Sequence, residues 1–518
     1  MRLKFFRRII DLLENSKVPF GYFIASFLFI VFLRSFLEIF SSLARFELMQ
    51  FYHYCLFYIT IALFLTLLFK IIIKIELEKI FRVILPTFVI IFVPPIIDLI
   101  VCLKKACIMT YLLPSPIHSD NLLYRFFTLG GEYKIIGGIT PGIKIELILI
   151  IIGSFFYFLI KNKGIIKSLF FSFLTYSIVF IYLIAPIWLN YFLKIFGKSF
   201  NYNFNLDFVN LYFLLIVLLS SILFYLYNKN YFKAIIGDLR ILRLLHFWLM
   251  LILGIVIGNA YVNKIGAGFN LYSFIPFPLI TVLMVILLAW LYSVITNNIE
   301  DKEIDKISNP TRPLITTISL DVYKKLAAVI LIFIIASSLA IGFEAFFIIL
   351  IFIGNYFLYS LPPFRLKRIT LFSKLIISFN SLILMILGYI LGYVYIDGVD
   401  ISQTIRSFPD SLILYILVFF TLAINFIDIK DYKGDKAAGI KTLPVILGLK
   451  KSQKIIGLFF LSAYIAAYFF FNFPFFFIYI FIILGIIQFL LINRQRYSEK
   501  PIFIVYLITL LIVIFFKK

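Results

Sequence analysis

The sequence predicts an all-α membrane protein that crosses the bilayer many times. Its 518 residues are 63% hydrophobic and have a mean hydropathy of +1.08. Only 14% of the residues are charged, whereas an average soluble domain contains roughly 25%. Many windows of about 20 residues are almost purely apolar, which is the length that a helix needs to cross a hydrocarbon core. These observations favour an integral membrane protein over a soluble domain.

The apolar windows form a group of six and a group of nine. The polar-interrupted segment Tyr227–Arg243 lies between the groups, so we expect a six-span N-terminal domain at 1–230 and a second domain at 231–518. The first window has no small-residue cleavage pattern after it, which indicates a retained span and not a signal peptide. The expected spans lie at about 19–43, 51–71, 83–103, 145–160, 168–193, 208–228, 243–262, 273–296, 325–343, 345–361, 373–396, 411–427, 455–471, 473–492 and 501–516.

The net charge of +23 is explained by the topology of the spans. Cytoplasmic loops of membrane proteins carry an excess of Lys and Arg. In the second half, alternate loops hold most of these residues, and only Lys264, Arg406, Lys517 and Lys518 fall on the other side. We therefore expect an integral protein of the cell membrane, with the N-terminus and the loops that carry the motifs described below in the cytoplasm and the C-terminus on the opposite side. The basic excess needs no nucleic-acid partner.

Two features outside the motifs below are weak signals. The three cysteines, Cys55, Cys102 and Cys107, are an odd number, and the three histidines are far apart, so a zinc site has little support. The long loop at 104–143, expected on the outer side, has no catalytic spacing.

An acidic stretch, NNIEDKEIDKISNPTRPL, follows the eighth span. In it, Asn297, Asp301 and Asp305 have the spacing i, i+4, i+8, which places them on one face if the helix continues. Mg²⁺ prefers oxygen ligands and commonly binds one or two carboxylates together with substrate phosphates. The alternative is a solvated acidic turn at the end of a helix.

A second acidic stretch favours the metal interpretation. In DIKDYKGDKAAGIKTLP, Asp428, Asp431 and Asp435 have the spacing i, i+3, i+7, which is again one helical face. This stretch also follows an apolar span on the side assigned to the cytoplasm. Two acidic stripes that face one compartment, each mixed with lysine, predict a site for Mg²⁺ and an anion together.

A basic loop, YSLPPFRLKRIT, lies between the two acidic stretches and on the same side of the membrane. Two prolines end the preceding helix, and Arg365 and Lys367 follow at once. Arginine and lysine are natural ligands for diphosphate. For Arg368 and Lys374 we favour an ordinary basic loop at the membrane edge.

Together these three stretches resemble the UbiA-type intramembrane prenyltransferases, over roughly 235–518. The family pattern N-D-x-x-D-x-x-x-D is matched from Asn297 to Asp305, with Asn298 where an aspartate is usual. The continuation DKISNPTRPL, which carries Arg312, is similar to the family's D-x-x-x-x-P-x-R-P. The basic loop resembles Y-S-x-P-P-x-R-x-K, and the second acidic stretch resembles D-x-x-D-x-x-G-D followed by G-x-x-T-L-P.

The resemblance implies a nine-helix UbiA-like bundle and a definite chemistry. It implies Mg²⁺-dependent transfer of an isoprenyl group from an isoprenyl diphosphate to an aromatic quinone precursor or a lipid acceptor within the membrane. The implied metal ligands are Asn297, Asp301, Asp305, Asp428, Asp431 and Asp435. The implied catalytic residues are Asp301, Asp305, Asp431, Asp435 and Lys367, and the implied substrate contacts are Arg312, Tyr359, Ser360, Arg365 and Lys367.

Several alternatives remain open at this point. The chain fits a transporter of an anionic or lipid substrate, or an inactive lipid-binding scaffold, less well, because its carboxylates cluster at one membrane edge and all the motif acids are present. His246 and Asn259 would either touch the acceptor or form interhelical hydrogen bonds. The N-terminal half resembles no family, and we expect it to deliver or receive a lipid substrate or to dock a partner.

Overall fold

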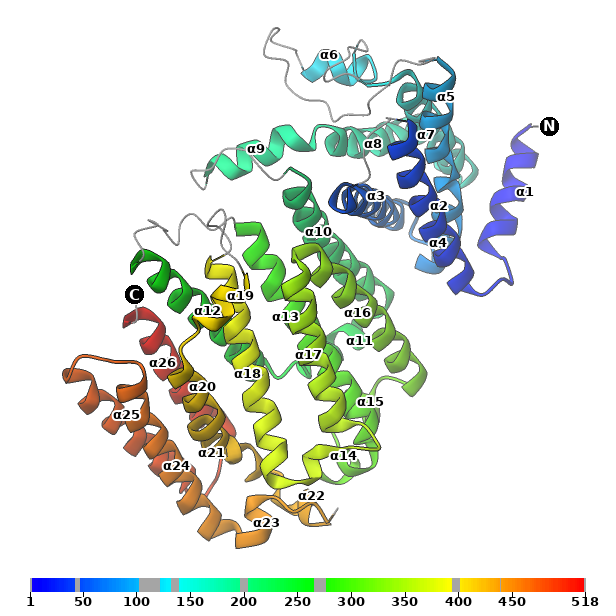
Figure 1. Ribbon diagram of the computed structural model, residues 1–518. Coiled ribbons are helices and arrows are strands. Elements are labelled where there is room, and N and C mark those ends of the chain that lie inside the picture. Colours follow the sequence, from blue (N-terminus) through cyan, green and yellow to red (C-terminus); the bar gives the residue numbers. More distant parts are fainter. Residues whose placement is uncertain are drawn as a thin grey trace. The chain divides into compact units, whose positions relative to one another are not determined.

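The computed structural model describes residues 2–41, 47–101, 122–131, 139–195, 204–264, 276–393, 401–437 and 439–516. Within these ranges the chain is helical, and its only β-type pairing is an isolated bridge between Ile369 and Lys441. The chain divides into two compact units, Met1–Lys229 and Asn230–Lys518 (Figure 1). Most of the loop at 104–143 lies outside the described residues.

The expected all-α polytopic fold is confirmed. In the described residues, 14 helices are long and apolar enough to cross a membrane, and Phe476–Ile492 is a shorter apolar helix. The protein is therefore an integral membrane protein.

The helices of the first unit pack mainly in pairs. Helix α7 packs against the next helix, α8, whereas α3 packs against α10 and α5 against α7, which lie further along the chain. The expected single span at 168–193 is wrong, because α8 ends at Leu183 and a new helix, α9, begins at Ala185. Pro186 cannot donate a backbone hydrogen bond to the preceding turn, which explains the break. The helices are α1 (Arg2–Glu14), α2 (Phe20–Ser41), α3 (Leu48–Ile73), α4 (Leu77–Thr87), η1 (Phe88–Phe92), α5 (Val93–Val101), α6 (Leu122–Phe127), α7 (Pro141–Ile160), α8 (Ile165–Leu183), α9 (Ala185–Ile195) and α10 (Phe204–Tyr227).

The second unit is a bundle of long helices with short helices between them. Its long helices are α12 (Ile241–Lys264), α13 (Pro276–Glu300), α16 (Leu320–Ile341), α17 (Phe343–Ser360), α18 (Thr370–Tyr393), α24 (Leu449–Phe470), α25 (Phe476–Ile492) and α26 (Glu499–Phe516). Its short helices are α11 (Lys229–Gly237), α14 (Lys302–Ser308), α15 (Pro313–Thr316), η3 (Leu366–Arg368), α19 (Ile401–Arg406), α22 (Tyr432–Ala437) and α23 (Leu443–Leu447).

The span at Asp410–Asp428 is helical throughout but changes its winding along its length. It begins as α20 (Asp410–Tyr415), passes through the π-helical segment η4 (Ile416–Phe420) and the short α21 (Thr421–Ala423), and ends as the 3₁₀-helical η5 (Ile424–Asp428). Such departures from regular α-helix are common at functional sites. Here the 3₁₀ segment ends on the first acid of the second motif.

Helices α12 and α18 approach each other closely, and glycine permits this approach. A Cβ atom added at Gly254 would lie 1.9 Å from the carbonyl oxygen of Met385, and one at Gly388 would lie 2.0 Å from that of Leu251. Small residues serve this purpose in membrane bundles, where apolar surface alone does not drive helices together. The contact holds α12 against α18. It therefore also fixes the relative positions of Arg240, which precedes α12, and Lys374, which lies on α18.

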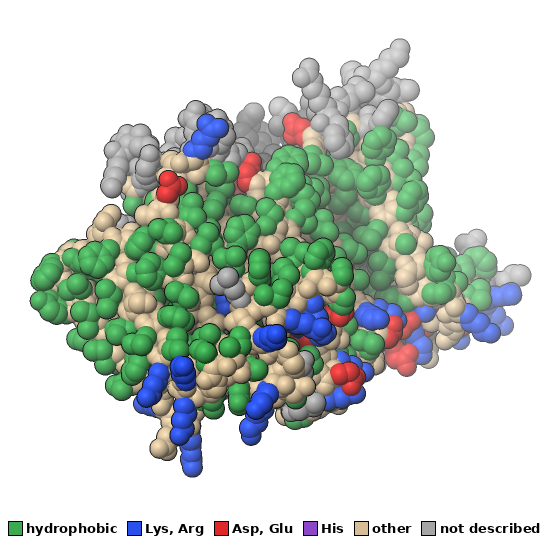
Figure 2. Space-filling model, turned by 60° about the horizontal axis from the view of Figure 1, so that its bottom comes forward, with side chains coloured by type: hydrophobic (Ala, Val, Ile, Leu, Met, Phe, Trp, Pro, Cys, Tyr) green, Lys and Arg blue, Asp and Glu red, His purple; other side chains and the backbone are tan. Residues whose placement is uncertain are grey.

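Charged side chains gather at one end of the second unit. Figure 2 views the molecule from the side on which α14, α15, α22 and α23 lie in Figure 1, and lysine, arginine and acidic side chains spread across this face while the flanks are hydrophobic. A hydrophobic flank suits contact with lipid, and a charged end suits contact with water.

Candidate active site

The first acidic motif continues across the end of α13. Helix α13 ends at Glu300 and α14 begins at Lys302, but the backbone hydrogen bonds persist across the junction. The N–H of Asp301 donates to the carbonyl of Asn297 at 2.9 Å, and the N–H of Asp305 donates to that of Asp301 at 2.8 Å. The i, i+4 spacing therefore still brings the three side chains to one face.

In the second motif, the backbone hydrogen bonds match the spacing of the three aspartates. The N–H of Asp431 donates to the carbonyl of Asp428 at 3.2 Å, and the N–H of Asp435 donates to that of Asp431 at 2.9 Å. One tight turn followed by one α-turn is what the spacing i, i+3, i+7 requires to keep three side chains together. Helix α14 packs against α22, so the two motifs meet.

The two motifs line one cavity of about 180 Å³ in the second unit. Its polar part is lined by all six oxygen-bearing residues of the motifs and by several cations, and its other part is apolar and aromatic. The oxygen-bearing residues are Asn297, Asp301, Asp305, Asp428, Asp431 and Asp435; the cations are Arg240, Arg243, Arg312, Lys367 and Lys374; the aromatic residues include Phe247, Trp290, Phe420, Phe460 and Phe503.

The basic loop contacts the first motif directly. The ammonium of Lys367 contacts both carboxylate oxygens of Asp301, and Arg365 Nη2 lies 2.9 Å from Asp301 Oδ1. Ser360 Oγ donates to Asn297 Oδ1 at 2.9 Å and is almost fully buried, so it orients Asn297. Burial lowers the pKa of Lys367, and the neighbouring Asp301 opposes this shift.

Of the expected substrate contacts, Tyr359, Arg312 and Lys367 line the cavity. Ser360 and Arg365 do not line it and instead contact the motif residues Asn297 and Asp301.

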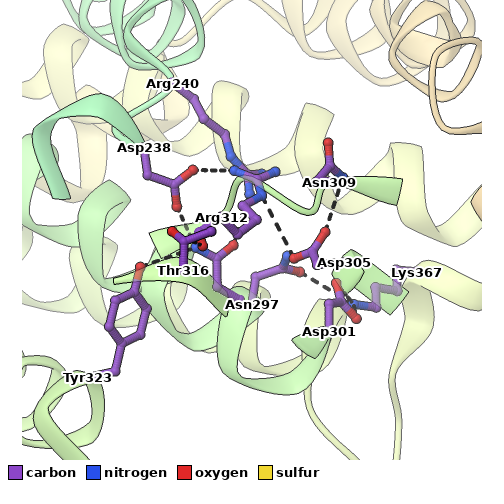
Figure 3. Close-up of polar contacts among 11 residues, drawn as sticks. Asp238, Arg240, Asn297, Asp301, Asp305, Asn309, Arg312, Thr316, Tyr323 and Lys367 are labelled. Atoms are coloured by element: carbon purple, nitrogen blue, oxygen red, sulfur yellow. Dashed lines mark hydrogen bonds and ion pairs between the residues drawn. The ribbon is translucent and has the colours of Figure 1, made fainter. Parts of the chain in front are cut away.

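Arg312 is held by a polar network behind the first motif (Figure 3). Its guanidinium pairs with Asp238, and its Nε lies 3.8 Å from Asp305 Oδ2. Asn298 Nδ2 donates to Asp238 Oδ2 at 2.5 Å, while Asn298 Oδ1 accepts from Arg240 Nη2 at 3.1 Å. An amide can donate and accept at once, so asparagine suits a place between a carboxylate and a guanidinium.

This network predicts that Asn298→Asp destabilises the protein although it restores the residue that is usual in the resembled motif. A carboxylate at 298 would face Asp238 at hydrogen-bond distance, and two carboxylates that close repel each other. We expect a loss of about 1–3 kcal/mol in the free energy of unfolding, because the hydrogen bond is also lost. The measurement is the thermal unfolding midpoint in detergent. The double variant Asp238→Asn with Asn298→Asp should recover most of the loss, and a double variant no more stable than Asn298→Asp would contradict the arrangement.

The second motif contains carboxylates that lack enough positive partners. Asp428 Oδ1 lies 2.5 Å from the Nζ of Lys374, but its Oδ2 is buried with no hydrogen-bond partner. Burial raises the pKa of Asp435 to about 7, with Asp428 and Asp431 adding to the effect, and burial also raises the pKa of Asp431. A cation bound among these acids would relieve both their burial and their repulsion.

The described residues hold no group of three or more His, Cys, Asp or Glu side chains already arranged to bind a metal ion. A preformed cage is not required, because Mg²⁺ usually keeps one or two carboxylates and takes its other ligands from phosphates and water. The donor set here, carboxylates and one amide oxygen, is the set that Mg²⁺ prefers.

Sequence reasoning missed part of the site. Lys374 is 2% exposed, lines the cavity and pairs with Asp428, so its interpretation as an ordinary edge-of-membrane lysine was wrong. Arg368, in contrast, is exposed as expected. Asp238, Arg240 and Arg243 were not singled out, because charges at the start of a span are usual in any membrane protein. The sequence feature that could have identified them is the short charged segment GDLRILR, in which all three lie within six residues.

His246 lies in the apolar part of the cavity and has two hydrogen-bond partners. Its Nδ1 lies 2.7 Å from the hydroxyl of Tyr506, and its Nε2 lies 2.7 Å from Ser381 Oγ. It therefore links α12, α18 and α26 and also lines the cavity. Asn259 does not line this cavity.

The second unit is thus a membrane-embedded helical unit with a cavity that is lined partly by charged and partly by aromatic side chains. Residues 265–512 match the model of the UbiA prenyltransferase family. These residues make up most of the second unit, and the family model and the names of the relatives support a membrane prenyltransferase. The N-terminal half matches no family model.

Curated relatives align with the C-terminal half. A digeranylgeranylglyceryl phosphate synthase of Sulfurisphaera tokodaii is 29% identical over 225 residues, which cover 40% of this chain and 77% of that protein. A protein of the same name from Thermococcus sibiricus is 32% identical over 199 residues, 37% of this chain and 64% of that protein. A 2-acyl-4-prenylphloroglucinol 6-prenyltransferase of Humulus lupulus is 28% identical over 207 residues, 38% of this chain and 49% of that protein.

Solved structures align with about half of the chain. A UbiA homologue from Archaeoglobus fulgidus bound to DMAPP and Mg²⁺ has 19% identity and a TM-score of 0.40, and the alignment covers 53% of this chain and 96% of that chain. A digeranylgeranylglyceryl phosphate synthase structure has 23% identity and a TM-score of 0.38, with 55% of this chain and 98% of that chain covered.

Proposed function

We propose that the protein transfers an isoprenyl group from an isoprenyl diphosphate to a lipid acceptor, and that the transfer depends on Mg²⁺. The observation that carries this proposal is the single cavity lined by both acidic motifs and by the cations of the basic loop, α12 and α18. The charged end suits a diphosphate, and the apolar end suits an isoprenoid chain.

The two acidic motifs would hold the metal. Asn297, Asp301 and Asp305 would serve one ion, and Asp428, Asp431 and Asp435 would serve another. The buried, unpartnered Oδ2 of Asp428 and the raised pKa of Asp435 both support a cation among these acids. Bound Mg²⁺ would supply positive charge to the diphosphate leaving group.

The cations of the cavity would bind and orient the diphosphate. Cleavage of an allylic C–O bond moves negative charge onto this group, so fixed positive charges around it lower the barrier. Arg312 is preorganised for this role by Asp238, while Lys367 is the cation that the basic loop places in the cavity. The aromatic walls would shelter the allylic cation from water, and their π faces attract positive charge.

The acceptor we propose is a lipid, because relatives named digeranylgeranylglyceryl phosphate synthase recur among the matches. An aromatic acceptor is the second candidate. It is favoured by the matches to the phloroglucinol prenyltransferase and to a probable homogentisate phytyltransferase of Oryza sativa. Polar residues of the apolar end, His246 and Tyr506, line the space where either acceptor would lie.

The position of the charges argues against the two rival functions. A transporter would place its substrate-binding charges near the middle of its spans, whereas the motif acids here lie at or just beyond the ends of α13 and η5. An inactive scaffold would not need a buried carboxylate oxygen without a partner, which costs free energy unless a ligand satisfies it.

We also propose that the charged end of the second unit and the N-terminus lie in the cytoplasm, with the C-terminus on the opposite side. The excess of lysine and arginine in the loops at this end supports this orientation.

Membrane vesicles of known sidedness test function and orientation together. Labelled geranylgeranyl diphosphate and Mg²⁺ are added outside, with geranylgeranylglyceryl phosphate or homogentisate as acceptor. We expect prenylated lipid to form in inside-out vesicles, and to form in right-side-out vesicles only after permeabilisation. A chelator should stop the reaction. Transfer that persists without divalent cation would overturn the metal assignment. Equal rates in both types of sealed vesicle would overturn the orientation. Prenylation of homogentisate alone would select the aromatic acceptor.

A further inference from the structure

The first unit contains an apolar cavity of about 490 Å³ that the proposed reaction does not use. Its walls come from α1, α3, α4, η1, α7 and α8, and all its lining residues belong to this unit. Its size falls in the range typical of small-molecule sites, roughly 300–1,000 Å³. Its lining is almost wholly apolar, so a ligand there would be mostly hydrocarbon.

One side chain breaks this apolar lining. Glu146 of α7 is the only charged residue among the described residues that line the cavity. It is 9% exposed, no side-chain hydrogen bond to it is found among the described residues, and Arg34 is the one cation that interacts with it. A carboxyl group buried in a membrane span without a hydrogen-bond donor is costly, and such groups usually mark functional sites.

The surroundings of Glu146 indicate which head group would suit it. The charged groups that interact with it are one cation, Arg34, and two further acids, Glu38 and Asp98. Arg34 already pairs with Glu38, and its guanidinium lies over the ring of Tyr58 at 5.8 Å. Asp98 accepts a hydrogen bond from the N–H of Gly142 at 2.8 Å. With no excess of positive charge nearby, a phosphate head would be repelled, whereas an uncharged hydroxyl can donate to the carboxylate.

Helix α1 covers part of the same cavity. Phe6, Ile9, Ile10 and Leu13 lie at i, i+3, i+4 and i+7, and all four line it. The end of α1 is tied to α7, because Glu14 pairs with Lys161 at 2.6 Å and accepts from the hydroxyl of Tyr157 at 3.1 Å. The amphipathic helix therefore forms a wall that a bound chain would contact.

We infer that the first unit binds one long-chain lipid alcohol, with its hydrocarbon in this cavity and its hydroxyl donating to Glu146. This site is separate from the prenyl-transfer cavity, and the inference does not depend on the proposed reaction. It assigns a ligand class to the half of the chain that matches no family.

The test compares three labelled probes that share one chain: hexadecanol, its methyl ether and hexadecyl phosphate. Binding to the full-length protein in nanodiscs is measured by native mass spectrometry. We expect one hexadecanol per chain, bound about tenfold more tightly than the ether, since a hydrogen bond to a charged group contributes that much. Hexadecyl phosphate should bind more weakly than the alcohol.

Matched variants locate the site. Glu146→Leu should abolish the difference between alcohol and ether. Gly153→Leu should weaken both, because Gly153 lines the cavity and a Cβ there meets open space. Gly21→Leu is the control: it adds the same bulk where a Cβ also meets open space, on α2 and away from the cavity lining.

Three outcomes would overturn the inference. They are equal binding of alcohol and ether to the wild type, tighter binding of the phosphate than of the alcohol, and unchanged binding in Gly153→Leu. The first would mean that the cavity holds ordinary acyl chains only. Retained prenyl transfer in the variants reports that the chain is folded, and loss of the proposed reaction itself would leave the binding result intact.

Discussion

Asp301→Asn lowers isoprenyl transfer by about 10²–10³-fold, the loss expected when one preorganised charged group of a catalytic site is removed. Asp301 lines the cavity, belongs to the first acidic motif, and contacts both Lys367 and Arg365. Its replacement would remove a proposed metal ligand and release the two cations that it positions. The measurement is the rate of prenylated product formation at saturating donor and Mg²⁺, together with the Mg²⁺ concentration that gives half of the maximal rate.

The matched control for this substitution is Asp321→Asn. Asp321 is also an aspartate that pairs with a lysine, since its Oδ2 lies 2.8 Å from the Nζ of Lys325, but both side chains are largely exposed and lie outside the cavity. An exposed pair of this kind contributes little to stability, so transfer should remain near the wild-type rate. Equal rates for the two variants would show that the first motif does not bind the reacting group.

Lys374→Met has the largest expected effect on stability, because it leaves the charge of Asp428 buried without a partner. The two side chains are buried and their charged atoms lie 2.5 Å apart. Removal of one partner from a buried ion pair typically costs about 3–5 kcal/mol. We expect the thermal unfolding midpoint in detergent to fall by several degrees, and the protein to be partly rescued by Mg²⁺, which would neutralise the unpaired, buried carboxylate of Asp428.

The double variant Lys374→Met with Asp428→Asn separates structural from catalytic roles. Without either charge the burial cost disappears, so stability should return most of the way to that of the wild type. Transfer should stay low, because the proposed metal ligand is lost. A double variant that is as unstable as Lys374→Met would show that the ion pair is not the cause, and one with full activity would remove Asp428 from the site.

Properties that depend on local sequence could be predicted well. The spans follow from the length of apolar runs, since any helix must be about 20 residues long to cross the bilayer. Each acidic motif lies on one face because its spacing matches the turn of its own backbone, even where α13 gives way to α14 or η5 to α22. The identity of the candidate site residues came from these two local patterns and the basic loop.

Properties that depend on contacts between distant segments could not be predicted. The spacing of Asp428, Asp431 and Asp435 does not reveal that α22 packs against α14, or that Lys374 turns inward to Asp428. Nor does the sequence show that Asp238 forms an ion pair with Arg312, because the two residues lie 74 positions apart in the chain. A lysine or aspartate beside a span has the same appearance whether it faces water or a cavity.

Hydropathy and helical period act over neighbouring residues, so the amino-acid sequence alone predicts a helical membrane protein with two acidic stripes and a basic loop on one side. That the stripes share one cavity, and that Glu146 is the one charged residue among the described residues lining another, emerges only from the fold. The direction of a side chain within a bundle is set by how the helices pack. In the second unit that packing depends on such details as the glycine contacts between α12 and α18.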